Sequence, residues 1–320
     1  MRVRTRVIVR YHCCTARHAG RRPGQRGHRY EGIAMNALRA RLARYLFLST
    51  DPRRKGLSWW DASELGLVAL GFLLYFLVRG AVVDRTADAF ANAHWIVNLQ
   101  YSYGLFVEPA FQAWVLEYEL LRRALNFVYF WMDFPLIVGV ALVMFWKRRS
   151  AYTLTRDSIL ISGGIGLVIY WLYPVAPPRF LSEWGFIDTL AVYDNLSYQA
   201  QSLQPFVNPF AAVPSLHVGW ALLLAVGVFA ATRNPWLRAA SIVTFVLQSI
   251  AVVGTGNHYI FDGLAGLVVC GVALGLTLAL HRGGYPVIRY WLGKWAGMVP
   301  SRPSLPRPAQ RPTRGLRSGA

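Results

Sequence analysis

Cysteine, lysine and acidic residues are scarce in this sequence of 320 residues, and each shortage limits what the protein can do. Of the three cysteines, Cys13 and Cys14 are adjacent and Cys270 lies within an apolar run. No disulfide framework is implied, because adjacent cysteines rarely bridge each other. The sequence holds no Cys/His cluster with metal-ligand spacing, no P-loop and no dinucleotide-binding glycine motif. We therefore expect neither a metal ion nor a cofactor.

The rest of the composition is strongly apolar. Hydrophobic residues make up 55% of the chain and charged residues 15%, which leaves more apolar surface than one soluble core can hide. The formal net charge of +19 lies mainly in the two ends and in short loops between apolar runs. Cytoplasmic loops of membrane proteins are basic in this way, and the basic ends lack the interleaved aromatic residues of a nucleic-acid surface. The composition predicts an all-α, multi-pass membrane protein that binds no nucleic acid.

The charge pattern divides the chain into three regions. Residues 1–60 are predicted to be a basic cytoplasmic region, in which 1–34 are either disordered or a wrongly assigned start ahead of Met35. Residues 61–282 are predicted to form the membrane domain, and 283–320 a basic, disordered tail. Both termini are therefore expected in the cytoplasm. Arg greatly outnumbers Lys, which suits a GC-rich genome and a bacterial inner (plasma) membrane.

Six apolar runs predict a bundle of six transmembrane helices. After the first run, residues 84–126 are too polar to span and are expected to lie on the membrane surface as amphipathic helices. Asp133 and Pro135 interrupt the second run, and the basic residues of 147–156 mark a cytoplasmic loop after it. Asp133 is either a buried, hydrogen-bonded acid or a contact for the substrate. The runs are Leu65–Val83, Phe127–Trp146, Ser158–Tyr173, Leu216 to about Thr232, Ala239–Val253 and His258–Leu280.

A histidine and a carboxylate stand four residues apart at the start of the sixth run. On a helix, His258 and Asp262 would share one face, so the carboxylate can lie beside the imidazole. With six spans and both termini inside, Arg179, Ser215 and His217 reach the same outer face as this pair. An Arg binds phosphate oxygens with a planar fork, and two histidines can divide the roles of nucleophile and general acid. The set predicts metal-independent phosphoryl transfer.

Three short motifs occur in order along the chain: Pro177-Pro178-Arg179, Pro214-Ser215-Leu216-His217 and His258-x-x-x-Asp262, with the segment Gly104–Pro109 ahead of them. Together they resemble the PAP2 superfamily of type 2 phosphatidic acid phosphatases, in its branch of inositol phosphorylceramide synthase (Aur1/Ipt1) type proteins. The resemblance implies that His258 attacks phosphorus to give a phosphohistidine while Asp262 orients its imidazole. It also implies that His217 protonates the leaving oxygen and that Arg179, with Ser215, stabilises the charge on the phosphate.

The chain departs from the longer family motifs at two cationic positions, where Leu172 and Val252 stand. Arg122 or Arg123 could fold over from the surface segment and replace a lost cation. Fewer cations suit a phosphodiester better than a dianionic monoester, which favours transfer between a phospholipid and an alcohol or inositol acceptor over hydrolysis of a lipid phosphate. Water and a second hydroxyl both remain open as acceptors. The rival interpretation is a non-enzymatic transporter or an inactive relative, whose intramembrane charges line a pathway.

Overall fold

The computed structural model describes residues 62–193, 208–288 and 291, so the predictions for residues 1–60 and for most of the C-terminal tail lie outside the described residues. The regular secondary structure of the described residues is helical, apart from one isolated bridge between Val175 and Ala211. The principal helices are α2 (Ala62–Val82), α3 (Thr86–Ser102), α4 (Glu108–Glu117), α5 (Glu119–Trp131), α6 (Phe134–Lys147), α7 (Arg149–Leu172), α8 (Thr189–Val192), α9 (Leu216–Ala231), α10 (Pro235–Gly254) and α11 (Ile260–Ala279).

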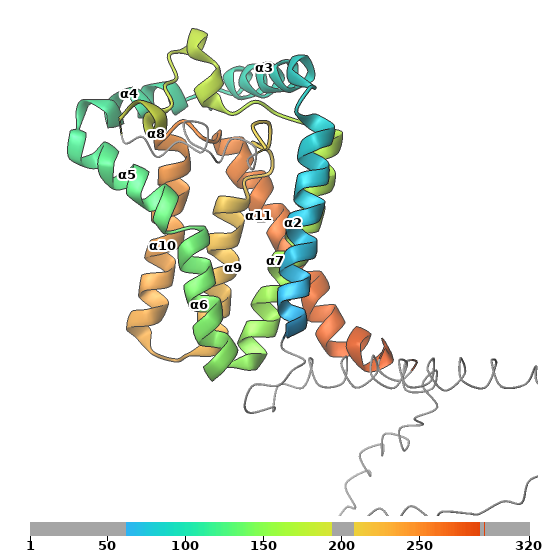
Figure 1. Ribbon diagram of the computed structural model, residues 1–320. Coiled ribbons are helices and arrows are strands. Elements are labelled where there is room, and N and C mark those ends of the chain that lie inside the picture. The colour runs from blue at the N-terminus through green and yellow to red at the C-terminus, as the bar shows by residue number, and fades with distance from the viewer. Residues whose placement is uncertain (1–61, 194–207, 289–290, 292–320) are drawn as a thin grey trace, which may run out of the picture.

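The long helices form a bundle with other helices laid across one end. Helix α9 packs against α7, α10 and α11, while α2 and α6 pack against α7. Helices α3 and α4 cross the end of the bundle at which α8 lies, at the top of Figure 1. We call this end the upper end. The prediction that residues 84–126 form helices along a surface agrees with α3 and α4, although α5 slants down into the bundle (Figure 1).

Three helical runs in the described residues are long and apolar enough to cross a membrane: Glu64–Val82, Pro235–Gly254 and Ile260–Ile288. The pair α5 and α6 would make a fourth if the two helices, bent by 46° at their junction, act as one span. Helix α9 is apolar but shorter, and α7 carries Arg156 and Asp157 among its apolar residues. The structure therefore shows a membrane protein with three or four candidate spans where the sequence predicted six.

The second predicted run is broken in the structure. Helix α5 ends at Trp131 and α6 begins at Phe134, with Asp133 at its N-cap position. Pro135 lies in the first turn of α6, where its missing amide hydrogen costs nothing because that hydrogen would have no helical partner. The basic loop predicted over 147–156 is also mostly helical, because only Arg148 separates α6 from α7.

An ionic cluster at the lower end ties α2, α7 and the extension of α11 together. Arg156 pairs with Glu64 and with its neighbour Asp157. The Oδ2 atom of Asp157 also accepts hydrogen bonds from His281 Nε2 at 2.8 Å and from the Tyr285 hydroxyl at 2.8 Å. Buried charges need such partners, because desolvation of an unpaired charge is costly. We call these five residues the lower ionic cluster.

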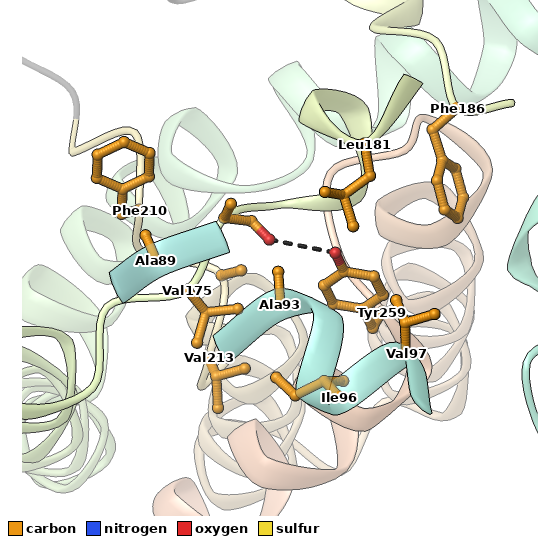
Figure 2. Close-up of a cluster of buried hydrophobic side chains, with 12 residues drawn as sticks. Ala89, Ala93, Ile96, Val97, Val175, Leu181, Phe186, Phe210, Val213 and Tyr259 are labelled. Carbon is orange, nitrogen blue, oxygen red and sulfur yellow. Dashed lines mark hydrogen bonds between the residues drawn. The ribbon is translucent and has the colours of Figure 1, made fainter. Parts of the chain in front are cut away.

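At the upper end, a hydrophobic cluster joins α3 to the segments that flank the site (Figure 2). Small and branched residues of α3 face residues from the connections that follow α7 and precede α9. Tyr259 is fully buried in this cluster, and its hydroxyl donates to the Ala176 carbonyl at 3.2 Å (Figure 2). The cluster thus fixes the residue that directly follows His258. Its labelled members are Ala89, Ala93, Ile96, Val97, Val175, Leu181, Phe186, Phe210, Val213 and Tyr259.

Candidate active site

His258 lies in the short connection between α10 and α11, and Asp262 lies in the first turn of α11. The Nδ1 atom of His258 is 3.2 Å from Asp262 Oδ2 and 2.9 Å from the Ala212 carbonyl oxygen. Both neighbours are acceptors, so Nδ1 carries the hydrogen and the lone pair is on Nε2. Asp262 is held in turn by the Tyr259 amide, which donates to Oδ2 at 2.9 Å. The predicted pair is therefore formed, in one defined tautomer.

Burial, together with the nearby His217 and Arg179, lowers the pKa of His258 well below the ordinary value of histidine. The side chain of His258 is only 6% exposed and that of Asp262 is fully buried. At neutral pH the imidazole is consequently uncharged, which is the state a nucleophile requires.

His217, in the first turn of α9, has a carboxylate partner of its own. Its Nδ1 atom is 2.9 Å from Asp133 Oδ2, and its Nε2 atom is 3.2 Å from the Tyr129 hydroxyl. The rings of Tyr129 and His217 are stacked with their centroids 4.6 Å apart. Asp133 was predicted to be either a buried acid or a substrate contact, and the structure places it as the buried partner of His217. Because Asp133 lies at the break between α5 and α6, its carboxylate can reach His217 on α9.

The two histidine rings are neighbours, with their centroids 5.5 Å apart and their planes tilted by 59°. Ser215, two residues before His217, is fully buried, and no described residue hydrogen-bonds to its Oγ atom. The Ser215 amide donates to the Asp262 carbonyl at 2.9 Å, so the loop before α9 is bonded directly to the first turn of α11. A Cβ atom at Gly266 would overlap the Ser215 carbonyl oxygen, which explains the glycine there. Ser215 thus sits in a fixed loop beside both histidines.

Arg179 reaches the site from the connection after α7. Its amide donates to the Gly256 carbonyl at 2.8 Å, and its guanidinium donates from Nη1 to the Asn257 side-chain oxygen. Its Nε atom lies 3.4 Å from Asp188 Oδ2. These contacts tie Arg179 to the residues immediately before His258. The guanidinium is held in place and is close enough to His258 to contribute to the lowering of its pKa.

The two further arginines proposed from the sequence behave differently from each other. Arg123 pairs with Glu119 on the same helix at 2.6 Å, and both side chains are about two-thirds exposed, so Arg123 does not reach the site. Arg122 places its guanidinium 3.7 Å above the ring of Tyr193, just after α8. It shares a face of α5 with Asn126, which bonds to Thr189 of α8. Arg122 therefore lies beside α8, and Arg123 points to solvent.

Sequence reasoning missed Tyr129, Gln248 and Asn257. Tyr129 lies in the last turn of α5, four residues before Asp133, and its ring stacks on His217. Gln248 is a fully buried amide in the apolar helix α10, 3.4 Å from His217 Nδ1. Asn257 directly precedes His258. A lone amide within an apolar span was the available signal for Gln248, since polar groups in such positions need partners.

The described residues contain no group of three or more His, Cys, Asp or Glu side chains that could hold a metal ion. The polar groups described around the two histidines are one guanidinium, two carboxylates, two hydroxyls and several amides. Asp133 Oδ1 and Gln248 Oε1 are buried and have no hydrogen-bond partner among the described residues. The site combines a fixed cation with hydrogen-bond acceptors, which suits a ligand that carries both an anion and a hydroxyl.

Comparison with known proteins agrees with this geometry. The family model of the PAP2 superfamily matches residues 94–276, which is more than half of the chain and includes every residue described above at the two histidines. A phosphoinositol dihydroceramide synthase from Bacteroides thetaiotaomicron is 27% identical over 150 residues, which cover 43% of this chain and 48% of that protein. The chain thus matches about half the length of this curated relative. No solved structure matches the chain. The chain belongs to the PAP2 superfamily.

Proposed function

We propose that the protein transfers a phosphoalcohol head group from a phospholipid to the hydroxyl of a second lipid, through a phosphohistidine at His258. The observation that carries the proposal is the pairing of both histidines with carboxylates, their rings 5.5 Å apart. One imidazole presents an unprotonated Nε2, and the other is positioned to exchange a proton. A histidine that served only a structural role in the core would not need a second histidine beside it that has a carboxylate partner of its own.

In the first step, His258 Nε2 attacks the phosphorus of the donor lipid and the bond to the leaving oxygen breaks. His217 gives its proton to that oxygen, so the lipid leaves as an alcohol. Arg179 and the Ser215 hydroxyl stabilise the charge on the non-bridging oxygens. Asp262 accepts the hydrogen bond from His258 Nδ1 and stabilises the positive charge that develops on the ring.

In the second step, the acceptor hydroxyl attacks the phosphohistidine. The proton of this hydroxyl passes to His217, the bond between nitrogen and phosphorus breaks, and both histidines return to their starting states. Asp133 holds His217 in a fixed orientation through both steps. Its second oxygen, Oδ1, is without a partner among the described residues and is available to the incoming hydroxyl.

Two features support transfer over hydrolysis. Among the three arginines considered, Arg179 bonds to Asn257 beside His258, while Arg123 pairs with Glu119 and Arg122 lies over Tyr193. A single guanidinium suits a monoanionic phosphodiester better than a dianionic monoester. The curated relative is named as a synthase that joins phosphoinositol to dihydroceramide, which makes an inositol phospholipid and a ceramide-type alcohol the substrates to test first.

For the membrane arrangement, we propose six spans: α2, the bent pair α5 and α6, α7, α9, α10 and α11. The turns after α6 and α9 lie side by side at the lower end, because Arg148 Nε donates to the Ala231 carbonyl at 3.0 Å. These turns carry Lys147, Arg148, Arg149 and Arg233. Positive loops stay in the cytoplasm, so the upper end, with the site, would face the other side of the membrane, and both termini would be cytoplasmic.

The test is an assay of the purified protein in detergent with a chelator, on phosphatidic acid alone and on phosphatidylinositol with ceramide. We expect a new inositol phospholipid and diacylglycerol without free phosphate. His258→Ala should lower turnover by roughly 10⁴-fold or more, as loss of a covalent nucleophile does. His94→Ala is the matched control, because His94 also lies at the upper end, where it is exposed and paired with Glu183.

Three results would contradict parts of the proposal. Undiminished turnover by His258→Ala would exclude the nucleophile. Release of free phosphate from phosphatidic acid, lost in His258→Ala, would identify a lipid phosphatase with the same site. Mass spectrometry of the wild-type protein, quenched at high pH during turnover with donor alone, should find the phosphoryl group on His258, and its presence on another residue would exclude the mechanism.

A further inference from the structure

Three polar side chains of the α3–α4 segment are buried although the segment lies across the end of the bundle. Gln100, Glu108 and Gln112 are 5%, 0% and 1% exposed. Gln112 exchanges two hydrogen bonds with the backbone of Ile187, at 2.9 and 3.0 Å, and so serves the loop before α8. Gln100 and Glu108 hydrogen-bond to a different part of the chain. A fully buried carboxylate is costly unless it is hydrogen-bonded, so its partners identify what it holds.

Glu108 and Gln100 bind the first amides of α11. Glu108 Oε1 accepts the Ile260 amide at 3.0 Å and a hydrogen bond from Gln100 Nε2. Gln100 Oε1 accepts the Phe261 amide at 3.2 Å. The first amides of a helix have no partner within it, and a negative charge at this end is favoured by the helix dipole. Two side chains from distant helices therefore bind the first two amides of α11, in addition to the local bond from the Tyr259 amide to Asp262.

The capped turn is the one that carries the reacting groups. His258 lies two residues before Ile260, and Asp262 lies two residues after it. The Asp262 carbonyl also accepts the Ser215 amide at 2.9 Å. A shift of this turn would therefore move the nucleophile, its carboxylate and the Ser215 loop together. Displacements of about 1 Å at a reacting group can lower a rate by about 10²-fold.

We infer that Glu108, acting with Gln100, is a positioning residue that holds the first turn of α11 in its reactive geometry. This inference rests on the function proposed above, and it assigns a role to the α3–α4 segment, which joins two candidate spans. Glu108 touches neither histidine, so it acts through the amide of Ile260. The role needs an acceptor oxygen, and a Gln at position 108 can supply one.

The experiment compares Glu108→Ala, Glu108→Gln and Gln100→Ala in the full chain, with Glu117→Gln as the matched control. Glu117 ends the same helix and is exposed. We expect Glu108→Ala to lower kcat by about 10²-fold with a much smaller change in KM, because Arg179 is held by Gly256, Asn257 and Asp188 outside this turn and still binds phosphate. Glu108→Gln should recover most of the lost kcat. The kcat of Gln100→Ala should lie between those of Glu108→Ala and Glu108→Gln, because Glu108 still accepts the Ile260 amide.

Hydrogen exchange in the peptide that contains residues 258–262 gives a readout that does not need turnover. We expect faster exchange there in Glu108→Ala, with exchange in α10 unchanged and with wild-type exchange in Glu117→Gln. Unchanged exchange in Glu108→Ala would overturn the inference, whatever the activity. Faster exchange with wild-type kcat, or a Glu108→Gln protein as slow as Glu108→Ala, would overturn the positioning role. A wild-type protein without turnover would contradict the proposed function instead, and exchange alone would then decide whether the cap exists.

Discussion

His258 and His217 both place Nδ1 against a carboxylate oxygen, but the two pairs are built differently. His258 and Asp262 lie four residues apart at the start of α11, at 3.2 Å, and are 6% and 0% exposed. His217 and Asp133 come from different helices, at 2.9 Å, and are 21% and 10% exposed. The first pair is closed to water and held by neighbouring amides. The second is more open, as a group that exchanges protons with a changing partner must be. This difference in exposure fits the roles proposed above, of nucleophile for His258 and of acid and base for His217.

Asp262→Asn should show the largest effect on this comparison. An Asn side chain can present its amide group to His258 Nδ1 and stabilise the wrong tautomer, which removes the lone pair from Nε2. We expect kcat to fall by about 10⁴-fold, the loss seen when the carboxylate that orients a catalytic histidine becomes an amide. Turnover of phospholipid measures this, with thermal unfolding in detergent as the check on folding. A fall of less than tenfold would mean that Asp262 does not set the tautomer.

Asp133→Asn should have a smaller effect that depends on the leaving group. We expect a fall of about 10²-fold with a phospholipid, because protonation of a poor leaving group needs a well-oriented acid. The fall should nearly vanish with a nitrophenyl phosphodiester, whose leaving group needs no proton. Asp262→Asn, in contrast, should remain impaired on both substrates. Equal losses for Asp133→Asn on the two substrates would show that His217 and Asp133 do not act as the general acid.

The smallest expected effect is on stability as the pH changes. Burial lowers the pKa of His258 in the folded state, so the unfolded chain takes up a proton near pH 6.5 that the folded chain does not. The contribution to the unfolding free energy is therefore complete above that pH and is lost as the pH falls toward the folded pKa. Thermal unfolding of the substrate-free protein across about pH 5 to 8 measures it. In His258→Asn, the unfolding temperature should depend less on pH on the acid side. A pH dependence parallel to that of the wild type would contradict the lowered pKa of His258.

Local patterns in the sequence predicted the His258 pair, whereas the His217 pair depended on the fold. The spacing of four residues predicted that Asp262 lies beside His258, and the contact forms although His258 itself precedes the helix. The approach of Asp133 to His217 requires the break between α5 and α6 and the packing of both around α9. A break of this kind was visible as Asp133 and Pro135, but its direction was not. The sequence therefore identified Asp133 as a candidate site residue but did not identify His217 as its partner.

The same limit applies to other predictions. Arg122 and Arg123 were predicted as replacements for a lost phosphate cation, but the face of α5 on which each lies depends on where that helix begins, and Arg123 pairs with Glu119 there. Six apolar runs predicted six spans, of which length and composition identify three or four as candidates, because α9 is short and α7 carries Arg156 and Asp157. A contact between residues far apart in the sequence, such as that of Glu108 with Ile260, cannot be predicted from the pattern of a single sequence.

Helix α11 is secured at both of its ends. Glu108 and Gln100 bind its first amides, and its extension past Ala279 joins the lower ionic cluster through His281 and Tyr285. A slide of even one residue, about 1.5 Å along the axis, would break both sets of contacts at once. We therefore expect α11 to keep its position during turnover. The admission of one lipid and the release of another must then be accommodated by movements of the helices around it.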